Sequence, residues 1–226
     1  MSEQAPYSYI ADYYESVQKK NATWPDVGEF WLSRFKHVSG KRVLNLGCGP
    51  MFYDNLVRFG EVPETYLGVD FNGQSFTFLE NDTHPNLSKN RAFAKKNGVQ
   101  MEFIEGDVFD ILPSVAEPFD TILGIGFFGT FAGEQLEKLL GLCREALTPE
   151  GKLLKMTWHG ARRTAEEEAD KLKYQYDNEL EPSPDELIEL FEKVGFQTVV
   201  NDVLDCPPNT INWAQIQVAL FQKTGV

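Results

Sequence analysis

Few of the features that assign a chain to a specialised class occur in this sequence. Its three cysteines, Cys48, Cys143 and Cys206, are odd in number and widely spaced, which fits neither a disulfide framework nor a paired metal-binding motif. The three histidines lie in unrelated segments, so neither a metal cluster nor a nucleophilic triad is indicated. We therefore expect no metal site.

Basic residues and long apolar runs are also scarce. The chain has 21 Lys and Arg against 34 Asp and Glu, a formal net charge of −13, so neither a nucleic acid nor an anionic membrane is an expected partner. No apolar stretch approaches the ~18–20 residues needed to span a bilayer. The N-terminal Met-Ser-Glu-Gln-Ala-Pro lacks the pattern of a secretory signal. With cysteines that show no disulfide pattern, this predicts a cytoplasmic protein.

What the chain does contain is the composition of a folded globular protein. Of its 226 residues, 42% are hydrophobic and 24% charged, which argues against disorder. The length is one that a single α/β domain commonly occupies. We expect one domain over residues 1–226.

The most informative segment is an apolar run that opens into a glycine turn, Val-Leu-Asn-Leu-Gly-Cys-Gly at 43–49. Glycine lacks a Cβ and tolerates positive φ, so this turn lets the backbone approach a ligand closely. A second apolar run ends in a carboxylate, Asp70, 23 residues after Gly47. This is close to the roughly 20 residues of one strand–helix–strand step in a nucleotide-binding unit. Such a carboxylate can accept hydrogen bonds from ribose hydroxyls. The pair predicts an adenosine-containing cofactor.

Strand-like and helix-like segments alternate, which predicts a mostly parallel sheet covered on both faces. The last two strand-like runs have no helix between them and indicate an antiparallel pair. Predicted strands cover 43–46, 65–71, 100–105, 121–126, 152–157, 197–204 and 213–222. Predicted helices cover 8–20, 25–37, 51–59, 74–80, 88–96, 136–147 and 184–194. Residues 148–151 read as a turn, and Ser183-Pro-Asp-Glu186 as a capping box that opens the last helix.

In five segments the chain resembles the class I S-adenosylmethionine (SAM)-dependent methyltransferase superfamily. They are Val-Leu-Asn-Leu-Gly-Cys-Gly (43–49), Leu-Gly-Val-Asp (67–70), Glu-Gly-Asp-Val (105–108), Phe-Asp-Thr-Ile (119–122) and Leu-Thr-Pro-Glu-Gly-Lys (147–152). The resemblance implies an α/β, Rossmann-like, three-layer αβα fold, with a seven-stranded, mostly parallel sheet and an antiparallel C-terminal pair. It also implies that residues 1–41 form a helical lid over a core at 42–226.

The resemblance further implies SAM as the cofactor. Gly47, Cys48 and Gly49 would pass under the methionine portion, and Asn45 would orient its end. Asp70 would accept hydrogen bonds from the ribose hydroxyls.

The same resemblance assigns residues to the adenine ring and the methionine amine. Phe71 would lie against the adenine edge, while Asp107 would accept from the adenine amino group. Val108 would pack on the ring, and the backbone near Gly124 would face the methionine amine.

A nicotinamide-dependent dehydrogenase is the alternative for the cofactor. Its motif has a third glycine, where this chain has Phe52. Within the methyltransferase resemblance, Asn45 stands where Asp or Glu is usual and Pro50 where a further glycine is usual. These departures are either without consequence or hold the methionine tail in an unusual conformation.

The implied reaction is methyl transfer to a small apolar or aromatic acceptor, by in-line displacement at the sulfonium. The Asn-Pro-Pro-Tyr motif of base amino-group methylation is absent after the fourth strand, where Phe127, Phe128 and Phe131 would wall an apolar pocket or pack in the core. One alternative is a cyclase resembling the azetidine-2-carboxylate synthases, in which SAM itself is the sole substrate and methylthioadenosine leaves. A second alternative is a SAM-binding partner subunit without catalysis.

The candidate catalytic side chains are Tyr14, His159 and Tyr176. Tyr14 belongs to a tyrosine-rich helical stripe of the expected lid, and tyrosine faces attract cations such as a sulfonium. Tyr176 comes from the segment after the fifth strand. His159 follows that strand on the side where ligands bind in open α/β sheets. The alternative for the two tyrosines is that they only pack against the body of the protein, and the alternative for the histidine is a position on the surface.

Overall fold

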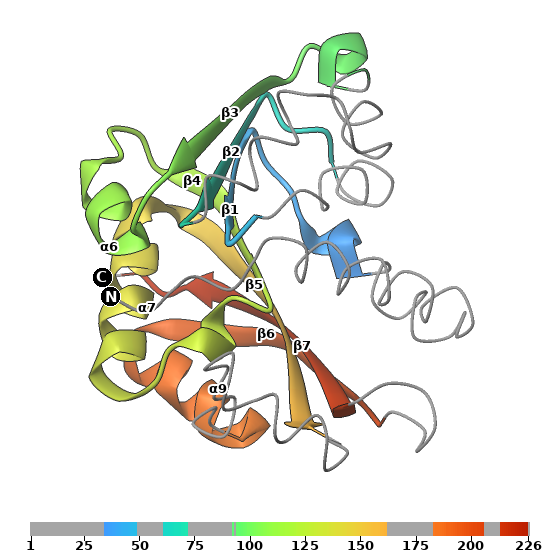
Figure 1. Ribbon diagram of the computed structural model, residues 1–226, viewed down its shortest axis with the longest axis vertical. Helices are drawn as coiled ribbons and strands as arrows, with labels where there is room; N and C mark the ends of the chain where they lie inside the picture. The colour runs from blue at the N-terminus through green and yellow to red at the C-terminus, as the bar shows by residue number, and fades with distance from the viewer. Residues whose placement is uncertain are drawn as a thin grey trace, which may run out of the picture.

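A seven-stranded sheet lies at the centre of the protein in the computed structural model (Figure 1). The structure describes residues 34–48, 61–71, 92, 94–161, 183–205 and 213–225. The strand order is β3-β2-β1-β4-β5-β7-β6. Strands β1 to β5 pair in parallel, and β7 pairs antiparallel with both β5 and β6. This confirms the predicted sheet with its antiparallel C-terminal strands.

The strands are β1 (Arg42–Leu46), β2 (Thr65–Asp70), β3 (Gln100–Glu105), β4 (Phe119–Ile125), β5 (Leu147–Ala161), β6 (Phe196–Asp205) and β7 (Trp213–Lys223). The helices are η1 (Arg34–His37), α6 (Val108–Ile111), η2 (Leu112–Ser114), η3 (Phe128–Thr130), α7 (Gly133–Ala146) and α9 (Pro184–Lys193). No helix in the described part of the chain is long and apolar enough to cross a membrane.

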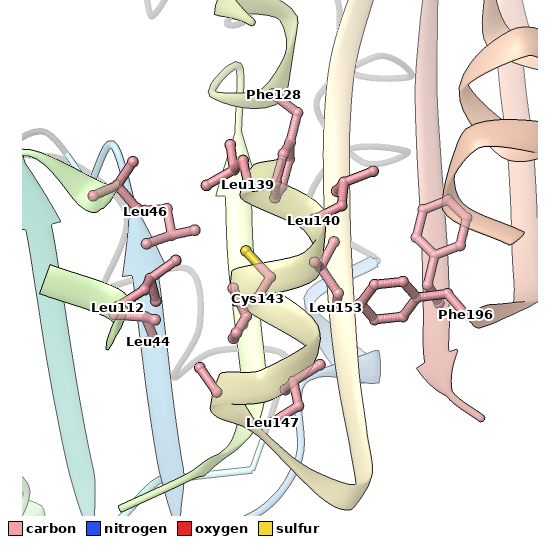
Figure 2. Packing of buried hydrophobic residues seen from close by; sticks show 14 of the residues in the cluster. Leu44, Leu46, Leu112, Phe128, Leu139, Leu140, Cys143, Leu147, Leu153 and Phe196 are labelled. Carbon is pink, nitrogen blue, oxygen red and sulfur yellow. The ribbon is translucent and has the colours of Figure 1, made fainter. Parts of the chain in front are cut away.

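Helices α6, α7 and α9 lie on the same side of the sheet (Figure 1). On α7, Leu136, Leu139, Leu140 and Cys143 recur every three or four residues and are fully buried. Figure 2 shows the last three directed at the strands. Full burial of one leucine contributes about 1.5–3 kcal/mol, so packing holds α7 on the sheet.

The opposite face of the sheet has its own buried cluster. Val43, Leu123 and Leu154 point to this side, and Val38 and Ala94 pack on it from outside the sheet. Because β1 is buried on both faces, its sequence does not alternate between apolar and exposed polar residues.

Helix α9 begins as predicted. The Ser183 hydroxyl accepts from the Glu186 N–H, and the Glu186 carboxylate accepts from the Ser183 N–H at 2.8 Å. This reciprocal pair satisfies N–H groups that would otherwise have no partner in the first turn.

Two predicted boundaries are wrong. Strand β5 spans Leu147–Ala161 rather than 152–157, because Leu147 pairs with Phe119 of β4 and pairing with β7 continues to Ala161. Its pairing with β4 jumps from Leu147 to Lys152, so the predicted turn at 148–151 lies within the strand, at a shift of its register against β4. The described part of the predicted helix 25–37 is a short 3₁₀ turn, η1. The predicted helices at 8–20, 51–59 and 74–80 lie outside the described residues.

Candidate functional site

The strand order reverses between β1 and β4. From β1 the chain moves outward to β2 and β3, and then crosses back to β4 on the other side of β1. In open α/β sheets such a reversal leaves a crevice outside the carboxyl ends of the strands, where ligands bind.

Backbone hydrogen bonds hold the turns at this edge together. The Cys48 N–H donates to the carbonyl of Val69 over 3.1 Å, and the Gly106 N–H donates to that of Asp70 over 3.0 Å. The turn after β1 is thereby held to the end of β2, and the end of β2 to the turn after β3. The segments carrying Gly47, Asp70 and Asp107, which are far apart in sequence, come together at one edge.

Gly47 meets two conditions that only glycine satisfies. Its φ is +60°, in the left-handed region, and a Cβ there would lie 2.6 Å from Cδ2 of Phe127. Phe127 follows β4, so the turn after β1 packs directly against the chain leaving β4. The glycine lets these two segments approach closely where the sheet opens.

Asn45 is a buried polar side chain beside this turn. It is 1% exposed, and its Nδ2 donates to the Tyr66 hydroxyl over 2.8 Å. Its Oδ1 has no hydrogen-bond partner among the residues that the structure describes. Leaving a buried acceptor unsatisfied costs about 1–3 kcal/mol. A ligand that carries an amine, as SAM does, supplies the missing type of donor, so this atom fits such a cofactor.

Cys48 is not suited to nucleophilic chemistry. Burial, followed by the negative charge of Asp70, raises the pKa of its thiol far above the ordinary range. The thiol therefore stays protonated near neutral pH. Within the described ranges, no group of three or more His, Cys, Asp or Glu is arranged to hold a metal ion.

The predicted nucleotide-binding residues differ in exposure. Asp70 ends β2 and is half-buried, and Phe71 directly after it is 67% exposed, an unusual exposure for an aromatic ring. Asp107 is exposed, and its Oδ1 accepts from the Phe109 N–H over 2.9 Å, capping α6. Val108 is only 6% exposed and packs in the core on the α7 side, so little of its side chain is accessible for the predicted contact with the adenine ring.

The phenylalanines after β4 divide into two groups. Phe128 is fully buried, and a Cβ on Gly124 would lie 2.1 Å from its Cε2, so Gly124 makes room for a core ring. For Phe128 the core alternative is confirmed. Phe127 and Phe131 are only partly buried, and their rings meet edge to face with centroids 5.1 Å apart. These two remain available to wall a pocket.

The remaining predicted residues fall partly or wholly outside the described residues. The backbone of His159 pairs with that of Gln215 in β5 and β7, and its side chain is among the undescribed parts. Tyr14, Gly49 and Tyr176 lie outside the described residues altogether.

Sequence reasoning missed several buried polar residues near the same edge. Lys155, Thr157 and Gln217 are all buried, as is the Tyr66 ring that holds Asn45. The one signal available was Lys155, a lysine that interrupts the apolar run of β5.

Known proteins resemble this chain in structure but not in sequence. No protein-family model matches the sequence, and a comparison with curated proteins finds no significant match. Among solved structures, the 1,6-didemethyltoxoflavin N1-methyltransferase of Burkholderia thailandensis, with bound S-adenosylhomocysteine (SAH), gives a TM-score of 0.59 at 18% identity, over 100% of this chain and 93% of that one.

Two further neighbours agree. The N-methyltransferase NodS of Bradyrhizobium japonicum WM9 gives a TM-score of 0.59 at 14% identity, over 87% of this chain and 94% of that one. The magnesium protoporphyrin IX methyltransferase of Synechocystis PCC 6803, also with SAH, gives a TM-score of 0.55 at 10% identity, over 99% of this chain and 90% of that one. The fold is that of the SAM-dependent methyltransferases. At such identities the likeness establishes the fold alone.

Proposed function

We propose that this chain is a SAM-dependent transferase that methylates a small apolar or aromatic molecule. One observation carries the proposal: within this fold, the positive-φ Gly47 turn is held by hydrogen bonding to the end of β2, where Asp70 lies. That arrangement supplies the close backbone approach and the ribose carboxylate that an adenosine cofactor requires.

The cofactor would lie across the carboxyl ends of β1 and β2. The Asp70 carboxylate would accept from the ribose hydroxyls, and the exposed Phe71 ring would lose water by covering the adenine edge. Asp107 would accept from the adenine amino group while keeping its capping hydrogen bond to the Phe109 N–H.

Asn45 would bind the methionine end. Its buried Oδ1 would accept from the α-amine, and the Tyr66 hydroxyl holds the amide in orientation from its other end. A neutral amide lowers the cost of burial relative to the carboxylate usual at this position, because a buried carboxylate is penalised far more strongly.

The bound cofactor supplies a sulfonium methyl group for displacement. The chain supplies position and a dry site, since such a displacement needs little acid or base catalysis from the protein. The partly buried rings of Phe127 and Phe131 favour an apolar or aromatic acceptor. Tyr14, His159 and Tyr176 stay proposed as side chains that contact the reactants.

Replacement of Asp70 tests the cofactor assignment. Asp70→Ala should weaken SAH binding at least about tenfold in calorimetric titration, since the ribose hydroxyls lose their acceptor. Asp110→Ala is the matched control, because it removes the same charge from an exposed position on nearby α6. Equal affinity in the wild type and Asp70→Ala would show that the site is misplaced.

A cyclase is the second candidate, favoured by the neutral Asn45. A carboxylate at this position would stabilise the protonated α-ammonium, whereas an amide leaves the amine better able to act as a nucleophile. A bond from that amine to the γ-carbon would form, the bond from the γ-carbon to sulfur would break, and the amine would release a proton. The products would be methylthioadenosine and azetidine-2-carboxylate.

One assay separates the candidates. The purified protein is incubated with SAM, with and without a pool of small acceptors, and adenosine products are followed by mass spectrometry. SAH formed only with acceptors supports methyl transfer. Methylthioadenosine from SAM alone, above the uncatalysed rate, supports the cyclase. Tight SAM binding with no turnover in either arm supports a partner subunit without catalysis.

A further inference from the structure

Strands β5, β6 and β7 continue past the edge where β1 to β4 end. The last pair between β4 and β5 joins Ile125 to Met156, and pairing of β5 with β7 continues to Ala161 and Trp213. Figure 1 shows this extension of β5 and β7 projecting beyond the sheet. Thr157 is the first residue past the last β4 pair, so it lies at the base of the extension, beside the carboxyl end of β4.

A row of buried polar groups crosses the sheet at this base. Lys155 and Gln217 are fully buried and Thr157 is 3% exposed. Lys155 and Thr157 share one face of β5 because alternate residues of a strand point to the same side. Gln217 lies opposite Thr157 on β7, and Lys155 Nζ donates to Gln217 Oε1 over 2.9 Å.

The contacts of Gln217 fix the direction of this lysine. Gln217 Nε2 donates to Asn201 Oδ1 over 2.8 Å and to the carbonyl of Pro184 over 3.3 Å. Its amide is thereby held between β6 and the first turn of α9. Since Gln217 pairs two residues beyond Lys155 along β5, the ammonium leans toward the carboxyl edge and toward Thr157.

The Thr157 hydroxyl is the group in this row that can bind a ligand. Its Oγ1 is buried and has no hydrogen-bond partner among the described residues. A hydroxyl can donate one hydrogen bond and accept others, and leaving it unsatisfied in the interior costs about 1–3 kcal/mol. A positive charge close by favours a partner that accepts and carries negative charge.

We infer that Thr157 and Lys155 form a subsite for an anionic oxygen of the acceptor, such as a carboxylate. The inference rests on the proposed function, since it assigns the acceptor to the carboxyl ends of β4 and β5. The Thr157 hydroxyl donates to the oxygen, the Lys155 ammonium supplies positive potential, and Gln217 positions the ammonium. The acceptor would therefore carry an apolar part that faces Phe127 and an anionic group that faces Thr157.

Bromide is a probe for this subsite because it reports anion binding without requiring a particular molecular shape. Crystals grown without chloride are soaked in sodium bromide, with and without SAH, and the anion is located by anomalous scattering. We expect a peak within about 3.5 Å of Thr157 Oγ1 in both crystals. The peak should disappear in Thr157→Val, which keeps the shape of the side chain, and in Lys155→Met.

Lys152→Met is the matched control, because it removes the same charge from the same strand at a half-buried position and should retain the peak. No peak in the wild type, or a peak that survives both Thr157→Val and Lys155→Met, overturns the inference. A peak that SAH displaces assigns the anion to the carboxylate of the cofactor and overturns the acceptor assignment. Titration of the same protein with SAH tests the proposed function separately, so the two failures are distinguishable.

Discussion

Alanine at Gly47 should destabilise the protein through two separable effects. A residue with a Cβ in the left-handed region costs about 1–2 kcal/mol. The new Cβ would also meet the Phe127 ring at 2.6 Å, and overpacking of this kind costs typically about 1–3 kcal/mol. Alanine regains about 0.4–1 kcal/mol by reducing the freedom of the unfolded chain. The net loss in the free energy of unfolding should be about 1–4.5 kcal/mol.

The chain offers a control for each effect. Gly98 has a φ of +70° with nothing within 4 Å of a Cβ, so Gly98→Ala tests backbone strain alone and should cost about 1 kcal/mol. Gly124 lacks positive φ but would place its Cβ 2.1 Å from Phe128, so Gly124→Ala tests the steric clash alone.

Urea denaturation of the three variants measures these losses, and SAH titration measures the effect on binding. In a double-mutant cycle, Phe127→Ala should reduce the cost of Gly47→Ala by more than about 1 kcal/mol, because the ring that blocks the Cβ is gone. The reasoning is refuted if Gly47→Ala costs no more than Gly98→Ala, or if Phe127→Ala brings no relief.

Other consequences follow from single buried or capping groups. Asn45→Leu removes both an unsatisfied buried acceptor and the amide donor to the Tyr66 hydroxyl, two effects on stability that oppose each other. The free energy of unfolding should therefore stay within about 1 kcal/mol of the wild type while SAH affinity falls about tenfold, and a loss of both in parallel would point to a structural role only. The hydroxyl and backbone N–H of Ser183 lower the pKa of Glu186 from its ordinary 4.5, so Glu186 stabilises the fold above that value and loses this effect as the pH falls through its folded pKa. The difference in melting temperature between the wild type and Glu186→Gln should therefore be largest near neutral pH and vanish in strong acid, and a constant difference would contradict the capping role. Burial raises the pKa of Cys48 and Cys143, so neither should react with iodoacetamide at pH 8 until urea unfolds the protein, as intact and peptide mass spectrometry would show.

Local patterns in the chain were sufficient for the architecture. Burial on both faces favours apolar residues along β1, and packing on the sheet requires apolar residues three and four positions apart on α7. Both elements can therefore be predicted from the order of residues in the sequence. The same holds for Gly47 and Asp70, because their spacing reflects one strand–helix–strand step and a turn that needs glycine. The capping box of α9 involves only neighbours in sequence, and it is found as predicted.

Tertiary structure alone decided what lies opposite each of these residues. That Gly47 must also make room for Phe127, that Phe128 belongs to the core, and that β5 runs on to Ala161 all depend on segments distant in sequence. The row of Lys155, Thr157 and Gln217 is likewise invisible in the chain, since an antiparallel register joins residues about 60 positions apart. Sequence periodicity records which face of an element is buried, whereas the partner on that face is set by how the strands pair.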